Sequence, residues 1–157
     1  MCSSDLAGRD WRASQSPRES RGLSTPARCT MKQLEETYRD YLNCLNRQAW
    51  DELGQYVDDQ VRHNGRLLRL SGYRAMLVKD FADIPDLQFK IQLLVCEPSR
   101  LAARLAFDCS PKGDFLGLRV NGRRVSFTEN VFYEFAGSKI ASVWSVIDKT
   151  AIEAQLR

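Results

Sequence analysis

The sequence has only one histidine in 157 residues, and none of its five cysteines forms a C-x-x-C pair. Structural zinc sites need cysteines and histidines at such close spacings, so no zinc site and no bound metal are expected. No apolar run approaches the roughly 18 residues of a membrane-spanning helix, and the N-terminus lacks the apolar core of a secretory signal. We therefore expect a cytoplasmic protein with free thiols that does not enter a membrane.

Motifs of nucleotide chemistry are also missing. The sequence contains no G-x-x-x-x-G-K-[ST] loop, no Rossmann glycine triplet and no G-x-S-x-G elbow. The net charge is only +3, and most of that excess lies before residue 31, so the remaining chain shows no basic surface for nucleic acid. What remains is chemistry without a cofactor, or simple binding, in a single globular domain.

Residues 1–30 differ in composition from the rest. They hold five arginines and six serines, and their apolar residues stand singly. Such a segment cannot bury enough apolar surface to offset the entropy lost on ordering. We expect a disordered tail, or a leader foreign to the natural chain, ahead of a domain at residues 31–157.

The first half of that domain shows the spacing of amphipathic helices. Apolar residues recur every three or four positions, and Pro85 ends the last such stretch. Ser71 is the predicted N-cap of that last helix. Asn64-Gly65 predicts the turn of a short hairpin. The predicted helices cover residues 32–45, 50–57 and 71–84.

The second half alternates apolar and polar residues, as strands with one buried face do. Asn121-Gly122 predicts a hairpin between the strands on either side of it, and a short helix is expected at the C-terminus. The predicted strands cover residues 87–95, 101–108, 118–120, 124–135 and 139–148. Helices followed by an antiparallel meander predict an α+β fold, with helices packed on one face of a curved sheet.

Polar groups among small residues indicate a ligand cavity in this sheet. Arg104 and Asp108 share a strand face with two alanines, which leave space beside them. Asp148, Glu129 and Asn130 are further candidates for such a site, and each candidate could instead have a structural role. Arg104 and Asp108 would form an ion pair or face solvent, and Asp148 would cap the final helix. Glu129 would pair with an arginine at the sheet edge, and Asn130 would bond a loop.

The C-terminal sequence is similar to a known family. Residues 137–148 read GSKIASVWSVID and residues 151–156 read AIEAQL, which resembles the G-K-I-x-x-x-W-x-x-x-D segment and Q-L ending of the SnoaL-like polyketide cyclase (ester cyclase) family. Four shorter segments also look like that family: His63-Asn64-Gly65, Pro85-Asp86-Leu87, Gly117-Leu118 and residues 129–132. Together the resemblance covers about residues 32–156.

The resemblance implies a cone-shaped nuclear-transport-factor-2-like (cystatin-like) fold, with three N-terminal helices against a curved antiparallel sheet. It also implies intramolecular aldol cyclisation or isomerisation in a hydrophobic pocket without a cofactor, with an aspartate as the base. Asp148 matches the family's W-x-x-x-D context, and Asp108 is its rival. The segment at residues 108–111 departs from the family's Gly-Thr-His-like stretch, which removes one histidine from the pocket.

The expected mechanism needs a dry cavity and an oxygen-binding group. Desolvation raises the pKa of a carboxyl so that it can act as a base towards carbon acids, and a donor stabilises the enolate oxygen. His63 is either part of this machinery or a satisfied structural residue. The predicted catalytic residues are Asp148, His63 and Asp108. The predicted substrate-binding residues are Asn64, Arg104, Phe107, Asn130, Phe132 and Trp144, with Tyr133 also in the wall.

Two other functions fit the same sequence. One is a non-catalytic module that binds a small molecule or dimerises. The other is a hydrolase or dehydratase that uses Asp108 and Asp148 as a pair, by analogy with other enzymes of the fold. The strand at residues 124–135 is apolar on both faces, with Phe127 on one and Phe132 on the other. Because one face covers the core, the other predicts a homodimer. The expected ligand is a hydrophobic small molecule.

Overall fold

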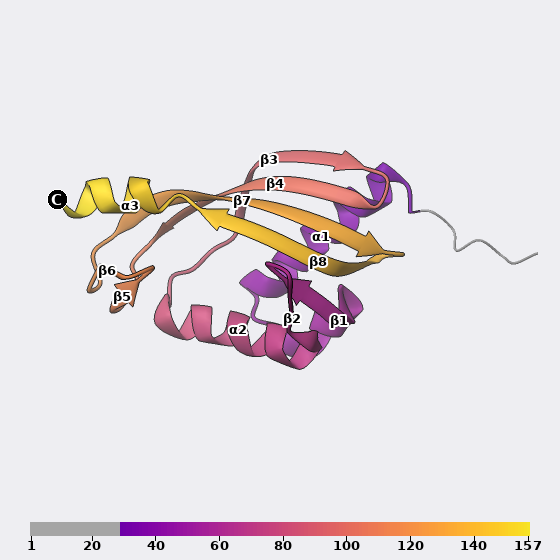
Figure 1. The fold of residues 1–157 in the computed structure, drawn as a ribbon, viewed down its shortest axis with the longest axis horizontal. Coiled ribbons are helices and arrows are strands. Elements are labelled where there is room, and N and C mark those ends of the chain that lie inside the picture. Colours follow the sequence, from indigo (N-terminus) through magenta and orange to yellow (C-terminus); the bar gives the residue numbers. More distant parts are fainter. Residues whose placement is uncertain (1–28) are drawn as a thin grey trace, which may run out of the picture.

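The computed structural model describes residues 29–157, which form helices packed against one curved sheet (Figure 1). Helix α1 (Met31–Asn46) starts at a capping box, in which the Thr30 hydroxyl accepts from the Gln33 N–H and the Gln33 side chain accepts from the Thr30 N–H. Its predicted apolar stripe, from Leu34 to Leu45, is buried. Asn46 then binds both backbone groups of Phe89, at 2.8 and 3.0 Å, and so ties the helix to the sheet.

Two further helical segments complete the layer beneath the sheet. The predicted second helix is the 3₁₀ turn η1 (Trp50–Gln55), and the third is α2 (Arg69–Asp83), which ends before Pro85 as predicted. The prediction that Ser71 caps α2 is wrong, because the helix has already begun at Arg69. The Leu68 N–H donates to Val61 O at 3.1 Å, so the hairpin that precedes α2 leads the backbone directly into it.

The main sheet has six strands in the order β2-β1-β8-β7-β4-β3. All its pairs are antiparallel except β1 with β8, which are parallel, so the predicted wholly antiparallel sheet needs this correction. In the parallel pair, β1 comes early in the chain, between η1 and β2, and β8 is the last strand. The strands are β1 (Val57–His63), β2 (Arg66–Leu67), β3 (Lys90–Glu97), β4 (Arg100–Cys109), β7 (Val125–Ala136) and β8 (Lys139–Ile147).

Both predicted Asn-Gly turns form, but only one joins the strands expected. Asn64 and Gly65 have φ of 47° and 80° and connect β1 to β2, as predicted. Asn121-Gly122 also turns, yet β6 (Leu118–Arg119) pairs with β5 (Asp114–Phe115) instead of β7. Leu116-Gly117, with φ of 52° and 76°, supplies the competing hairpin turn.

The pairing register assigns each residue to one of two faces. The inner face, toward the helices, carries rows such as Leu105–Glu129–Ile147, and the outer face carries rows such as Ala102–Phe132–Trp144. In β4 the buried residues alternate from Leu101 to Cys109, which leaves Arg104 and Asp108 exposed. The prediction that these two residues face a cavity is therefore wrong. The larger apolar side chains of β4 face the helices, because that contact buries more apolar surface.

Helix α3 (Lys149–Leu156) closes the chain near β7, as predicted. Most of the predicted tail lies in residues 1–28, outside the described residues. Within residues 29–157, no helix has the length and apolar character needed to cross a bilayer. The four cysteines of this part are all free.

Candidate active site

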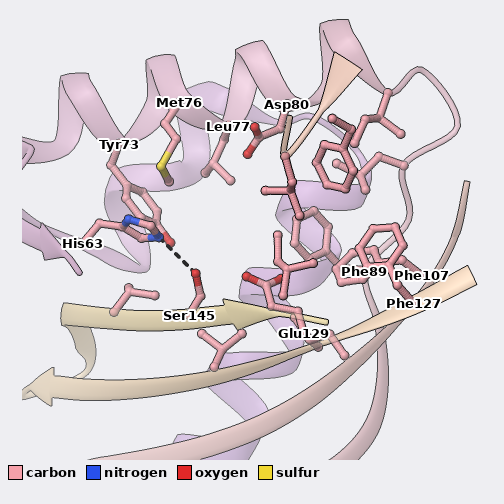
Figure 2. Close-up of a pocket in the computed structure, with 18 of the residues that line it drawn as sticks. His63, Tyr73, Met76, Leu77, Asp80, Phe89, Phe107, Phe127, Glu129 and Ser145 are labelled. Carbon is pink, nitrogen blue, oxygen red and sulfur yellow. Dashed lines mark hydrogen bonds between the residues drawn. The ribbon is translucent and has the colours of Figure 1, made fainter. Parts of the chain in front are cut away.

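A cavity of about 260 Å³ lies between α2 and the inner face of the sheet. Figure 2 shows side chains that enter it from α2 on one side and from β7 and β8 on the other. Its walls are mainly apolar and aromatic, and no lysine or arginine of residues 29–157 lines it. The lining residues are Tyr41, His63, Tyr73, Met76, Leu77, Asp80, Ile84, Leu87, Phe89, Leu105, Phe107, Phe115, Leu116, Phe127, Glu129, Val131, Tyr133, Val143, Ser145 and Ile147.

The structure brings only part of the predicted site to this cavity. His63 and Phe107 line it, as does Tyr133. Asn64 lies beside it, where its side-chain oxygen accepts from the Ser145 N–H at 2.9 Å. The other predicted site residues lie outside the cavity, and these are Arg104, Asp108, Asn130, Phe132, Trp144 and Asp148.

Asp148 and Asp108 have the structural roles that the sequence offered as alternatives to catalysis, a helix cap and an ion pair. The Asp148 carboxylate accepts from the Ala151 N–H at 3.0 Å and caps α3, and its side chain is exposed. The Asp108 carboxylate accepts two hydrogen bonds from Arg124, at 2.7 and 2.8 Å, which hold its pKa below the usual range. These placements correct the expectation that either carboxylate faces the substrate.

Glu129 is the carboxylate that the sheet does present to the cavity. It lies mid-strand on the inner face of β7, beside Leu105 of β4 and Ile147 of β8. Burial raises its pKa to about 7, against a smaller opposing effect of the Ser145 hydroxyl. The predicted ion pair of Glu129 with an arginine does not form among the described residues. In the sequence, Glu129 is the one acid on an otherwise apolar strand face. The structure shows that this position faces the cavity and not an arginine at the sheet edge.

Asp80 enters the same cavity from α2, so two carboxylates face it from opposite walls (Figure 2). Burial raises the pKa of Asp80 to about 6, lowered somewhat by Lys79 and raised further by Asp83. Our sequence analysis missed this residue. The signal was an acid three positions after Leu77, on the apolar stripe of the helix.

Three hydrogen-bonded pairs of polar side chains lie in or next to the cavity. His63 Nε2 lies 3.4 Å from Ser145 Oγ, and burial lowers the pKa of the imidazole, which favours its neutral form. The hydroxyls of Tyr41 and Tyr73 lie 2.7 Å apart. The buried Tyr38 hydroxyl donates to that of Tyr133 at 3.2 Å.

This arrangement suits proton transfer in an apolar environment. The rings of Phe107 and Phe127 stack with centroids 5.2 Å apart, and Phe89 contacts Phe107 edge-on at 5.3 Å. Such walls exclude water from bound substrate and disfavour charge on the nearby carboxylates. Among the described residues, no three His, Cys, Asp or Glu side chains gather as metal ligands would.

Comparisons with known proteins agree with this architecture. A crystal structure of a SnoaL-like polyketide cyclase from Agrobacterium tumefaciens is 63% identical, with a TM-score of 0.78 over 79% of this chain and 98% of that one. IdmH from Streptomyces antibioticus, named as a candidate polyketide cyclase, shares 18% identity and the fold, with a TM-score of 0.69 over 79% and 98% of the chains. Among curated proteins, none matches.

A third solved structure, a candidate polyketide cyclase from Xanthomonas campestris, is 16% identical with a TM-score of 0.69, over 81% of this chain and 98% of that one. The fold is thus the nuclear-transport-factor-2-like α+β fold that the resemblance implied. The sequence profile described as SnoaL-like polyketide cyclase matches residues 35–156, which is most of the chain. With this match and the 63% identity to the Agrobacterium protein, the chain belongs to the SnoaL-like polyketide cyclase family.

Proposed function

We propose that the protein is a cofactor-independent enzyme that acts on a hydrophobic carbonyl compound, a polyketide-like ester, by general acid–base catalysis. The reaction class is intramolecular aldol cyclisation or isomerisation. The observation that carries this proposal is the pair Glu129 and Asp80, two carboxylates that face one apolar cavity. Within the described part of the chain, no lysine or arginine lies in the wall of that cavity. The names of the related proteins support the substrate class.

The chemistry begins with Glu129 as the base. Its carboxylate takes the proton from a carbon next to the carbonyl, and the electron pair of that C–H bond moves to the carbonyl oxygen as an enolate. In cyclisation, the enolate carbon then forms a bond to the carbon of a second carbonyl of the same molecule, and the C=O π bond of that carbonyl breaks. The alkoxide formed takes up the proton that Glu129 holds, directly or by way of Asp80. In isomerisation, a different carbon takes up a proton from Glu129 or Asp80. A base whose pKa lies near 7 suits this task better than an ordinary carboxylate.

This proposal moves the base from Asp148 to Glu129. A general base must come within hydrogen-bond reach of the proton it removes, directly or through one water. Asp148 and Asp108 are exposed and lie outside the cavity, so a hydrolase or dehydratase built on that pair loses its geometric basis. If the protein does not accelerate the proton exchange described below, the hypothesis of a non-catalytic binding module is favoured.

The experiment is exchange of the acidic α-proton of β-keto esters in deuterated buffer, followed by NMR. We expect the protein to accelerate exchange for hydrophobic esters. The rate should rise with pH through about 7, because Glu129 accepts a proton only when it is ionised. A panel of β-keto esters with no acceleration at any pH would contradict the proposal and favour a binding module.

We also propose a homodimer through the outer face of the sheet. Val95, Ala102, Phe132 and Trp144 are consecutive partners across β3, β4, β7 and β8, and they form an apolar row. Phe132 is 60% exposed and Val146, on the neighbouring row, is 70% exposed. Apolar area of this kind on a sheet face suits a second copy of the same face, packed by two-fold symmetry.

Light scattering after size exclusion tests this interface. The protein should elute as a dimer at micromolar concentration, and Phe132→Glu should shift it to monomer because a charge would be buried at the contact. Glu134→Gln, a change on the same outer face at its edge, is the matched control and should stay dimeric. A monomeric wild-type protein would refute the interface.

A further inference from the structure

We propose that the hydrogen-bonded pair Tyr41–Tyr73 is the oxygen-binding part of the site, which holds the carbonyl oxygen of the substrate and stabilises it as an enolate. This inference rests on the proposed function, since the enolate is what Glu129 generates. It assigns a role to two residues from different helices, Tyr41 of α1 and Tyr73 of α2, that are not among the site residues predicted from the sequence.

Four buried tyrosine hydroxyls have more protons than the hydrogen bonds among themselves use. Tyr38, Tyr41, Tyr73 and Tyr133 bring four buried O–H donors together, and two hydrogen bonds join them in pairs. Each bond uses one proton, so one proton of each pair has no acceptor among the described residues. Tyr38 donates to Tyr133, so the proton left in that pair belongs to Tyr133. The other belongs to Tyr41 or Tyr73.

The hydroxyl protons without an acceptor belong to tyrosines that line the cavity. Tyr41, Tyr73 and Tyr133 line the cavity, whereas Tyr38 does not. Every spare phenol proton therefore belongs to a cavity-lining residue. A buried donor without an acceptor costs free energy, and an oxygen of a bound ligand would relieve that cost.

The surroundings of Tyr41 and Tyr73 favour this pair over Tyr133 as the oxygen-binding group. Burial is the main cause that raises the pKa of Tyr41 and Tyr73, and the charge of Glu129 adds a smaller contribution, as it also does for Tyr38 outside the cavity. Tyr73 also lies beside His63, with ring centroids 6.4 Å apart, at the end of the cavity that holds Ser145 (Figure 2). A base and an oxygen-binding donor must act on one substrate, and Tyr41, Tyr73 and Glu129 line the same cavity.

The state of the two hydroxyls also fits the role. Burial keeps the pKa of Tyr41 and Tyr73 above the usual phenol value, so both remain protonated donors. Their mutual hydrogen bond has an ordinary O–H···O length of 2.7 Å, and the hydroxyl that accepts in it has its own O–H polarised toward a further acceptor. Fixed donors aimed at developing negative charge in a dry site are an effective way to stabilise an oxyanion.

The test measures binding, so it does not depend on catalysis. Dinitrophenol, an acidic phenol whose ionised oxygen imitates the enolate, is compared with dinitroanisole, its neutral methyl ether. Binding to the full chain is followed by calorimetry at about pH 5, below the pKa of about 6 of Asp80 and of about 7 of Glu129. Both carboxyls are then largely protonated, as Glu129 is after it has taken the substrate proton.

We expect Tyr41→Phe and Tyr73→Phe each to weaken binding of dinitrophenolate about tenfold or more, and that of dinitroanisole only about twofold, because hydrogen bonds to charged oxygens are the stronger ones. Tyr38→Phe is the matched control. It removes an equally buried phenol hydroxyl that does not line the cavity, and both affinities should stay unchanged. Thermal unfolding of each variant confirms that it is folded.

Three outcomes would overturn the inference. The wild-type protein could bind the phenolate no better than the ether, the two ligands could lose affinity equally in the tyrosine variants, or Tyr38→Phe could have the same effect as Tyr73→Phe. Failure of the proposed function is seen elsewhere, as absent proton exchange. A selective loss of phenolate binding without exchange would support the oxygen-binding pair and remove only the base.

Discussion

Glu129→Gln is expected to lower the rate of α-proton exchange by about 10²–10⁴-fold, the range for loss of a general base. Glutamine keeps the size and the hydrogen-bonding ability of the side chain but cannot accept the substrate proton. The same substitution should also abolish the rise of the rate through pH 7 that ionisation of Glu129 produces. NMR exchange rates of wild type and variant, measured across this pH range on one β-keto ester, give both results.

The same variant has a signature in stability. Because burial raises the pKa of Glu129 from 4.5 to about 7, the folded protein holds this proton more tightly than the unfolded chain. Stability therefore falls as pH rises from about 4.5 to beyond 7. Glu129→Gln removes this loss, so above pH 7 it should be more stable than wild type, by as much as about 3 kcal/mol. Denaturant unfolding at two pH values measures the difference.

Asp148→Asn is the control for the activity of Glu129→Gln. It also neutralises a carboxylate, but at the exposed cap of α3, and asparagine caps a helix nearly as well as aspartate. Exchange and stability should both remain close to wild type, while Asp148→Ala should cost about 1 kcal/mol of stability and leave exchange intact. A large loss of exchange in Asp148→Asn, with little loss in Glu129→Gln, would return the base to Asp148.

Phe127→Ala should destabilise the fold by about 3–5 kcal/mol, the usual cost of removing a large buried ring. Phe127 is 6% exposed and contacts both Phe107 and Phe115, at ring centroid distances of 5.2 and 5.5 Å. Its loss would also enlarge the cavity at the aromatic wall. Denaturant unfolding gives the change in stability at constant pH.

Phe132→Ala is the matched control, on the same strand but on the opposite face. Phe132 is 60% exposed, so within one chain its removal should cost much less stability than that of Phe127. The comparison at low protein concentration, where subunits separate, tests the assignment of the two faces of β7. Equal losses in the two variants would contradict that assignment.

Local sequence signals predicted most elements of this fold. The three-and-four spacing of α1, the alternation of β4 and β7 and the Asn64-Gly65 turn all depend on a few neighbouring residues, and the structure confirms them. The boundary of α2 and the partner of β6 did not follow from such signals. Both depend on contacts made by a neighbouring segment, the β1–β2 hairpin for α2 and the Leu116-Gly117 turn for β6.

In the site, too, some features follow from local sequence and others only from tertiary packing. By itself the sequence determined the family resemblance, the α+β class and the two sets of residues that share each strand face, because these follow from order and period along the chain. Which face of the sheet turns inward was decided only by packing against the helices, which buried Phe127, partly buried Glu129 and left Phe132 and Arg104 exposed. Only that packing placed Asp80 opposite Glu129 across an apolar cavity, and the loss of water around them raised the pKa of both carboxyls toward neutrality.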